Sequence, residues 1–545
     1  VLAQKLGGVI SGEHGIGITK YQYLSDELKN EFVKYKKLID PDNNFNKGKL
    51  MPGSGLENAF TPSLRLVEQE ALILESSEIG EINDMVKSCL RCGKCKSVCT
   101  THVPEANLLY SPRDKIIGTN LISEAFLYEE QTRRGVSLNH FNEFNDVADH
   151  CTICHRCSTP CPVNIDFGDV SIKMKSVLIK QNKRRSNIMA KTSIAYLNMT
   201  KPWQIKLTKK LLIDVSYKAQ NISSKLVKPF LTKKPGKTVG RPNFTTEVVT
   251  MLDKPLPTDT SLAPLRELLN INDTGVIPIL SHPEKSNPGS ESVFYFPGCG
   301  SERLYSQISL ATIALLYHQG VKVVLPPSYL CCGYPQTSSG DENKGRKIST
   351  DNRVLFHRMA NTLNYLDIKR VLTSCGTCID QLITYELGDI FKDSTLADIH
   401  EYLLENNVTL DSNNEQYLYH APCHDPIKSD DSAKVISKIT NTEIVTNDRC
   451  CGEAGTFAVA RADIAKQARF KKQAEIKKDL TTINHNKKPV KMLTTCPACR
   501  QGLSRYKGST NIEPIYPIEL IAEQTLGKNW KKEFVESVNI EKVLL

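Results

Sequence analysis

The sequence predicts a multidomain protein of the mixed α+β and α/β classes, in which a helical cysteine-rich domain is followed by two tandem α/β repeats. Eight cysteines stand in two runs of identical spacing, and the other ten form a five-cysteine pattern that occurs twice. Around the second pattern, short apolar segments of strand character alternate with helical segments, which is typical of α/β folds. The 545 residues leave room for about three or four domains, each with its own core.

Two runs of four cysteines mark the helical domain. Both have the spacing C-x2-C-x2-C-x3-C: Cys89, Cys92, Cys95, Cys99, Cys151, Cys154, Cys157 and Cys161. This spacing resembles the signature of bacterial ferredoxins with two [4Fe-4S] clusters, in which three cysteines of one run and the fourth of the other hold each cluster. The resemblance implies that Cys161 completes the first cluster and Cys99 the second. Pro162 follows the last cysteine as the pattern expects, whereas Thr100 replaces the proline of the first run.

Zinc and disulfide bonds are the alternatives for these eight cysteines. Four ligands satisfy a zinc ion, so a zinc site would leave the third cysteine at two-residue spacing without a role. Disulfides between neighbouring loop cysteines at this spacing are geometrically awkward, and the cysteine usage is that of a cytosolic protein. We therefore expect two [4Fe-4S] clusters in this domain.

The other ten cysteines form a duplicated pattern of one cysteine, then Cys-Cys-Gly, then Cys-x-x-Cys. Its two copies are Cys299, Cys331, Cys332, Cys375 and Cys378, and Cys423, Cys450, Cys451, Cys496 and Cys499. In the first copy a helix is expected over residues 304–318 and a strand over residues 321–325. Functional sites of open α/β sheets lie at the carboxyl ends of the strands, so the cysteine groups of each copy should converge. Five thiolates per site indicate a cluster rather than a single ion.

These repeats resemble the CCG domains of heterodisulfide reductases and of the iron-sulfur subunits of glycolate oxidase and anaerobic glycerol-3-phosphate dehydrogenase, over residues 290–520. The resemblance implies one further iron-sulfur cluster per repeat, which is a non-cubane [4Fe-4S] cluster in the heterodisulfide reductase relatives. A structural zinc or a redox-active thiol pair is the alternative for each repeat. His420 and His424 flank Cys423 and stay unassigned between ligand, supporting donor and ordinary polar packing.

The first segment contains a glycine-rich motif around Glu13 and His14. A helix expected over residues 25–39 follows, and then Asp-Pro at 40–41 and Phe-Asn-Lys-Gly-Lys at 45–49. This order resembles the carboxyl-terminal end of FAD-linked oxidases of the D-lactate and D-2-hydroxyglutarate dehydrogenase type, although Lys47 stands where that family has proline. The chain starts inside this domain, so we expect it to be a carboxyl-terminal fragment.

The resemblance to FAD-linked oxidases also implies roles for the motif residues. His14 would be the base that takes the proton of the substrate hydroxyl, because neutral imidazole suits proton abstraction near physiological pH. Glu13 would ligate a divalent metal that holds the hydroxyacid and lowers the pKa of its hydroxyl. FAD would bind to a domain upstream of Val1, so this segment alone is not expected to perform the reaction.

Residues 182–241 carry most of the positive charge. They contain 15 Lys or Arg and one acid, Asp214, in a chain of formal net charge +10. Nine prolines from Pro229 to Pro288 indicate a linker. An amphipathic helix is expected over residues 201–215, which either packs one face on a neighbouring domain or lies on an anionic membrane surface. No apolar stretch is long enough to cross a bilayer, and nothing resembles a nucleic-acid module, so no nucleic-acid partner is expected.

The expected domain boundaries follow from these segments. They are 1–53 for the truncated end of an FAD-linked oxidase C-terminal domain, 54–80 for a connector, 81–181 for a dicluster ferredoxin domain, 182–289 for a basic, Pro-rich linker with helices, 290–410 for the first CCG domain and 411–545 for the second. This order resembles that of a bacterial family in which a flavin dehydrogenase, a two-cluster ferredoxin and two CCG domains are fused.

We therefore expect the electron-transfer part of an FAD- and iron-sulfur-dependent oxidoreductase acting on the CH–OH group of a D-2-hydroxyacid such as D-lactate or D-2-hydroxyglutarate. Electrons would pass from FAD through the clusters to a quinone or another acceptor. A heterodisulfide- or thiol-type reductase module and a zinc-stabilised, non-redox scaffold are the alternatives. The expected location is cytoplasmic, with peripheral contact to the inner face of the cell membrane left open.

Overall fold

The computed structural model describes residues 5–8, 16, 21–45, 48, 50–53, 78–103, 110–131, 138–185, 187–227, 236–238, 240, 242–257, 262–412, 415–483 and 488–545. The chain divides into two compact units, Val1–Glu68 and Gln69–Leu545. Glu13, His14 and Lys47 lie outside the described residues. The roles expected of the glycine-rich motif therefore stay predictions.

The first unit contains the short 3-10 helix η1 (Tyr21–Tyr23) and the helix α3 (Asp26–Ile39). Helix α3 begins after Ser25, whose hydroxyl accepts the backbone N–H of Leu28 at 3.4 Å and so satisfies a free donor of the first turn. Acidic residues in its first turn and lysines in its last turn complement the helix dipole. The helix expected over residues 25–39 is thus confirmed.

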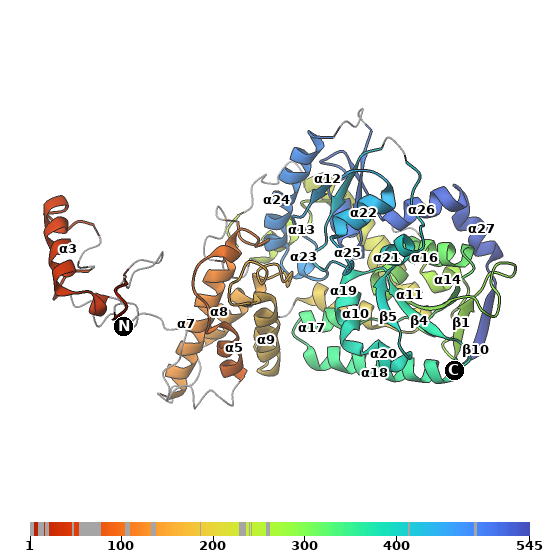
Figure 1. The fold of residues 1–545 in the computed structure, drawn as a ribbon, viewed down its shortest axis with the longest axis horizontal. Helices are drawn as coiled ribbons and strands as arrows, with labels where there is room; N and C mark the ends of the chain where they lie inside the picture. The colour runs from red at the N-terminus through yellow and green to blue at the C-terminus, as the bar shows by residue number, and fades with distance from the viewer. Residues whose placement is uncertain are drawn as a thin grey trace. The chain divides into compact units, whose positions relative to one another are not determined.

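Four helices surround the two runs of ferredoxin-type cysteines. They are α5 (Glu78–Val86), α7 (Pro112–Gln131), α8 (Leu138–Asp149) and α9 (Phe167–Lys180), with the 3-10 turn η3 (Lys94–Lys96) between the first two. The helices pack against one another (Figure 1). Phe144, Met174 and Leu178 are buried between them. Helix α9 begins after Asp166, whose carboxylate accepts the backbone N–H of Gly168 at 2.6 Å. The expected helical character of this domain is confirmed for its described residues.

A second group of helices connects this domain to the repeats. They are α10 (Ile188–Asn198), α11 (Pro202–Thr208), the π-helical η4 (Lys209–Val215), α12 (Ser216–Val227), α13 (Phe244–Met251) and α14 (Leu265–Leu268). The elements α11, η4 and α12 follow one another without a break, so the expected amphipathic helix forms and continues to Val227. Ile205 on its buried face packs with Tyr196 and Tyr329, and Gln220 donates to the Met251 carbonyl at 3.1 Å. One face therefore packs on neighbouring parts of the protein.

The first repeat forms a six-stranded sheet in the order β10-β1-β3-β2-β4-β5. Its strands are β1 (Val276–Leu280), β2 (Ser292–Phe296), β3 (Lys322–Val324), β4 (Ile368–Thr373), β5 (Thr395–Asp398) and β10 (Ile540–Leu544). Strands β2 to β5 are parallel, whereas β1 is antiparallel to both β3 and β10. The sheet thus includes β1, which precedes Cys299 of the first repeat, and β10, which follows Cys499 of the second repeat.

The helices of the first repeat lie in the connections between its strands. They are α15 (Gly298–Arg303), α16 (Ser306–His318), α17 (Tyr334–Ser338), α18 (Glu342–Thr362), α19 (Gly376–Leu382), η6 (Ile383–Tyr385), α20 (Leu387–Ile390) and α21 (Ile399–Glu405). Helix α16 and strand β3 confirm the helix expected over residues 304–318 and the strand expected over residues 321–325. Every residue of β2 is buried, as is typical of a parallel strand covered on both faces.

The second repeat forms a four-stranded parallel sheet in the order β7-β6-β8-β9. Its strands are β6 (Tyr417–His420), β7 (Ile444–Asn447), β8 (Val490–Thr494) and β9 (Ile512–Ile515), and its helices are α22 (Ser432–Thr440), α23 (Phe457–Ala460), α24 (Ala462–Leu480), α25 (Pro497–Ser504), α26 (Pro517–Leu526) and α27 (Trp530–Ser537). The order β3-β2-β4-β5 of the first sheet matches β7-β6-β8-β9 of the second. The shared order confirms the duplication inferred from the cysteines.

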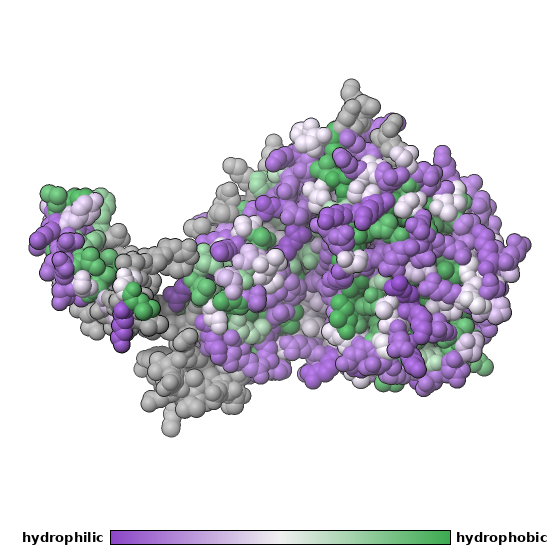
Figure 2. Space-filling model, in the orientation of Figure 1, coloured by the Kyte–Doolittle hydropathy of each residue, from purple (hydrophilic) through white to green (hydrophobic). Residues whose placement is uncertain are grey.

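One hydrophobic core joins the two repeats. It contains Tyr295 and Leu372 of the first sheet together with Tyr419 and Leu493 of the second. Helices α16 and α26 pack against each other across the boundary (Figure 1). On the face drawn in Figure 2, most of the surface over the repeats is hydrophilic, as expected when apolar strands are covered. Among the described helices, none combines the length and apolar character needed to cross a membrane.

Candidate metal centres

The two loops that carry the ferredoxin-type cysteines have matching backbones. In the first loop, residues 89–95, Arg91 and Gly93 adopt positive φ angles of 56° and 79°. In the second loop, residues 151–157, Ile153 and His155 occupy the same two positions, both with φ of 55°. Left-handed residues at alternate positions curl each loop inward and turn backbone N–H groups toward the sulfurs. Each loop therefore wraps its three cysteines around one centre.

Backbone N–H groups donate to four of these sulfurs. The donor and acceptor pairs are Arg91 to Cys89 at 3.4 Å, Ile153 to Cys151 at 3.4 Å, Ile165 to Cys161 at 3.3 Å and Phe167 to Cys157 at 3.4 Å. Such bonds stabilise negative charge on sulfur and are a means by which proteins tune iron-sulfur clusters. The arrangement suits thiolate ligands.

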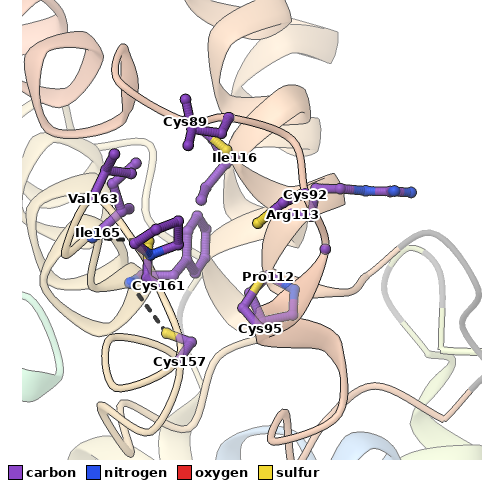
Figure 3. Close-up of a pocket in the computed structure, with 14 residues that line it drawn as sticks. Cys89, Cys92, Cys95, Pro112, Arg113, Ile116, Cys157, Cys161, Val163 and Ile165 are labelled. Carbon is purple, nitrogen blue, oxygen red and sulfur yellow. Dashed lines mark hydrogen bonds between the residues drawn. The ribbon is translucent and has the colours of Figure 1, made fainter. Parts of the chain in front are cut away.

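A cavity lies where the first loop meets the end of the second run (Figure 3). Its cysteines are Cys89, Cys92, Cys95, Cys157 and Cys161. The structure thus brings the first three cysteines of the first run together with Cys161, as the ferredoxin pattern implies, and Cys157 also lines the space. The remaining wall is mostly apolar and includes Ile116, Val163 and Ile165, whereas Cys92 at its edge is exposed.

The second predicted set of ligands combines Cys151, Cys154 and Cys157 with Cys99, and the structure has Cys99 beside Cys151 and Cys157. Burial raises the pKa of Cys157 to about 12, and the neighbouring thiols of Cys151 and Cys99 raise it further. Burial likewise raises the pKa of Cys95 to about 11. Thiols held protonated by apolar surroundings become thiolates when a metal cation binds them. The soft, closely grouped donors therefore fit an iron-sulfur cluster at each of the two centres.

Each five-cysteine site lies at the carboxyl ends of three neighbouring strands. The first site collects its cysteines after β2, β3 and β4, and the second collects its cysteines after β6, β7 and β8. In both sheets the connections leave the central strand in opposite directions, so the cysteines meet at a topological switch point. The convergence expected from the sequence is confirmed.

The Cys-Cys-Gly turns are held in the same way in both repeats. Gly333 and Gly452 adopt φ angles of 94° and 82°, which side chains with a Cβ rarely allow. The hydroxyl of Tyr385 donates to the Cys332 carbonyl at 2.8 Å, and that of Tyr506 donates to the Cys451 carbonyl at 2.9 Å. Both tyrosines are fully buried, so these bonds fix the turn beneath each site.

Thiol contacts join the two sites into one series. Successive contacts link Cys299, Cys331, Cys332, Cys378, Cys375, Cys496, Cys499, Cys451, Cys450 and Cys423. The step from Cys375 to Cys496 crosses from the first site to the second. Gly376 makes this approach feasible, because a Cβ there would lie 1.8 Å from the His424 carbonyl oxygen.

The second five-cysteine site also touches the dicluster domain. Contact with the Cys154 thiol raises the pKa of Cys423 to about 12, and burial adds to the rise. Arg156 of the second loop donates to the carbonyls of Asp448 and Ala421, the latter at 3.2 Å. The dicluster domain is therefore bound directly beside the second site.

Polar residues at this junction include one of the two unassigned histidines. His424 Nε2 lies 3.1 Å from the Ile153 carbonyl and 3.2 Å from the Tyr334 hydroxyl, which also contacts His155 at 3.1 Å. His424 Nδ1 pairs with Asp380 at 2.6 Å. His424 thus has hydrogen-bond partners on both nitrogens and holds the second loop against the repeats.

The other unassigned histidine, His420, faces the second site. One of its ring nitrogens lies within 4.8 Å of the sulfurs of Cys451 and Cys499. Burial and the nearby Lys472 lower the pKa of His420 to about 4, so the ring is neutral. Sequence reasoning missed Lys472, since a lysine in a helix is ordinarily exposed, whereas this side chain is fully buried.

Comparison with protein families agrees with this architecture. The chain matches the FAD linked oxidases C-terminal domain over residues 1–50, the 4Fe-4S dicluster domain over 85–165, the cysteine-rich CCG domain over 293–383 and 417–504, and a domain of unknown function over 504–545. No solved structure matches the chain.

Several curated proteins are similar over much of the chain. The probable glycolate oxidase iron-sulfur subunit of Bacillus subtilis is 22% identical over 80% of this chain and 93% of its own length. The glycolate oxidase iron-sulfur subunit of Escherichia coli is 21% identical over 82% of this chain and 96% of its own length. The D-2-hydroxyglutarate dehydrogenase of Escherichia coli is 24% identical over 31% of this chain, which spans 20% of that protein. The chain thus joins the end of an FAD-linked oxidase domain to the dicluster and paired cysteine-rich domains of iron-sulfur oxidoreductases.

Proposed function

We propose that this chain is the iron-sulfur electron-transfer part of an FAD-dependent dehydrogenase that oxidises a D-2-hydroxyacid, such as D-lactate or D-2-hydroxyglutarate. FAD would lie in a preceding domain, and a quinone or another acceptor would take the electrons. The observation that carries the proposal is the unbroken series of cysteine contacts from Cys154 to Cys299. Two [4Fe-4S] clusters held by the dicluster cysteines and one cluster at each five-cysteine site would supply one-electron transfer.

The protein's own residues prepare these sites in three ways. The two loops present thiols together with backbone N–H donors, and apolar side chains such as Ile116 and Ile165 line the cavity beside them. Arg156 and His424 hold the dicluster domain against the second five-cysteine site. The order of contacts supports passage from the dicluster domain to the second site and then to the first, which differs from the order of the domains along the chain.

The roles of the first segment follow from its similarity to FAD-linked oxidases. We propose His14 as the base for the substrate hydroxyl and Glu13 as a ligand of a divalent metal at the hydroxyacid site. His14→Gln in the protein with its flavin domain should abolish substrate-driven flavin bleaching. The clusters should still be reduced by dithionite. Unchanged bleaching would exclude the role of His14.

Metal analysis separates this function from its alternatives. After anaerobic purification we expect iron and acid-labile sulfide in about equal amounts, and EPR signals that appear on reduction. Zinc with little sulfide would instead establish a non-redox scaffold. Assays with D-lactate, D-2-hydroxyglutarate and disulfide substrates, using dye and quinone acceptors, then distinguish a dehydrogenase from a thiol-type reductase. Disulfide reduction without hydroxyacid oxidation would refute the proposal.

An apolar stripe on the outer face of α11, η4 and α12 supports peripheral membrane contact. The stripe consists of large exposed side chains: Trp203, Leu207, Leu211, Val215, Ile222 and Leu226. Their exposed fractions run from 52% to 70%, although the opposite face of the same helices is packed. Exposed lysines accompany the stripe at Lys201, Lys206, Lys210, Lys218 and Lys225. Apolar residues flanked by lysines match a surface of anionic lipid.

Vesicle flotation tests this contact. The holoprotein should bind phosphatidylglycerol vesicles and be released by salt, because about 1 kcal/mol per lysine comes from charge. Leu207→Ser/Leu211→Ser should lower the affinity about thirtyfold, since burying the exposed half of each leucine contributes about 1 kcal/mol. Val354→Ser/Ile383→Ser alters similarly exposed residues outside the stripe, at 56% and 58% exposure, and should bind normally. Equal binding by the two variants would exclude the stripe.

A further inference from the structure

The second five-cysteine site contains a buried histidine that the first site lacks. Strand β6 ends at His420, three residues before Cys423, whereas β2 ends at Phe296, three residues before Cys299. Both side chains are fully buried. A ring nitrogen of His420 lies within 4.8 Å of the sulfurs of Cys451 and Cys499. The duplicated sites therefore differ at the position closest to the end of the central strand.

Lys472 determines which nitrogen of His420 carries the proton. Its ammonium group lies 2.9 Å from His420 Nδ1, 3.4 Å from the Asn447 carbonyl and within bonding distance of the Asn447 side-chain oxygen. An ammonium has three donors and no acceptor, so these three atoms satisfy it completely. Nδ1 must then accept, and the proton of the neutral ring lies on Nε2. The 3.2 Å approach of Nδ1 to the Asn447 carbonyl is consequently a contact between two acceptors.

His420 Nε2 is left pointing into the site. It has no nitrogen or oxygen partner among the described residues, although the side chain is fully buried. Leaving a buried N–H without an acceptor is costly, and the available acceptors are the cysteine sulfurs. Because the N–H already occupies Nε2, this nitrogen is a donor to sulfur and not a metal ligand.

We propose that His420 donates an Nε2–H···S hydrogen bond to the cysteine ligands of the second five-cysteine site, with Lys472 fixing the donor tautomer. This inference rests on the proposed electron-transfer function. Hydrogen bonds to ligand sulfur stabilise the more negative, reduced state, so His420 raises the reduction potential of this site. The first site has Phe296 in this place, which offers no donor, and its positive charge comes from Arg303 near Cys299. The hydrogen bond is therefore expected at the second site and not at the first.

An EPR-monitored redox titration of the holoprotein tests the proposal. His420→Met keeps the side-chain volume and removes the donor, whereas His420→Gln keeps an N–H group within reach. In His420→Met, one centre should move to a more negative midpoint, with about a tenfold change in its ratio of reduced to oxidised forms at a fixed potential, as expected for a bond to a charged group. His420→Gln should restore most of the shift, and the other centres should not move.

Controls separate this inference from the proposed function. His400→Gln changes another fully buried histidine, whose Nδ1 lies 2.6 Å from Asp398, and should leave every midpoint unchanged. If His420→Met has normal iron and sulfide but unaltered midpoints, the hydrogen bond is refuted. A strong nitrogen coupling from labelled histidine in pulsed EPR would show direct ligation and also refute it. Wild-type protein without sulfide would instead overturn the electron-transfer function itself.

Discussion

Arg156 offers a direct test of the contact between the dicluster domain and the second five-cysteine site. Its guanidinium donates to the carbonyls of Asp448 and Ala421, and the Cys423 and Cys154 thiols raise its pKa against the opposing effect of burial. A hydrogen bond from a charged donor contributes about 1.5–3 kcal/mol, so two bonds give about 3–6 kcal/mol. The side chain is 21% exposed, and solvent screening reduces this to about 2–3 kcal/mol.

We therefore expect Arg156→Gln to weaken the docked arrangement by about 2 kcal/mol, which is about thirtyfold in its equilibrium. After rapid photoreduction, freeze-quench EPR should show the dicluster centres reduced for longer and the second site reduced later. Lys94 occupies the matching position in the first loop and is exposed, so Lys94→Gln is the control. Equal transfer rates in Arg156→Gln and wild type, at equal iron content, would refute the assignment of this junction as the electron path.

Further predictions concern stability. Tyr385→Phe should lower the free energy of unfolding by about 2–3 kcal/mol and Tyr506→Phe by about 1–2 kcal/mol. The loss is larger at Tyr385 because its hydroxyl also accepts a hydrogen bond from an asparagine at 3.0 Å. Urea titration of the holoprotein measures both losses, and equal losses would contradict this difference. Gly452→Ala should reduce iron content, since the added Cβ would lie 2.5 Å from the side chain of a buried arginine and would distort the turn. Full iron occupancy in this variant would disprove the distortion. Burial opposes ionisation of Asp149, but Arg184 at 2.7 Å outweighs burial and lowers the pKa of the carboxyl group. The ionised carboxylate therefore stabilises the fold at neutral pH, and this stabilisation is lost as pH falls below about 4. In Asp149→Asn, the free energy of unfolding should depend less steeply on pH in the acid range, and an unchanged slope would exclude this role.

Local signals in the sequence predicted much of the fold. Ser25 followed by acidic residues marks the start of α3, and the apolar run of β2 marks a strand covered on both faces. The repeated cysteine pattern predicted two tandem α/β repeats, each with a site at the carboxyl ends of its strands. These features depend on residues close together in the chain or on a regular period, so they can be recognised without a structure.

Long-range packing explains what the sequence left open. The contact of Cys154 with Cys423 depends on how the second loop docks, and no spacing encodes that arrangement. Lys472 becomes a partner of His420 only when α24 covers β6 and β7, and its charge suggests exposure. The pairing of β10 with β1 likewise joins segments more than 250 residues apart, and neither strand carries a motif.

Strand β10 gives the paired repeats a closed connectivity. The chain leaves the first sheet after β5, builds the whole second sheet and then returns to pair β10 with β1 of the first. A cut between the repeats would therefore deprive the first sheet of its outer strand as well as expose the shared core. We expect neither repeat to behave as an exchangeable module. Any engineered fusion or shortened variant should keep residues 276–545 together, because β10 completes the first sheet and the two repeats share one core.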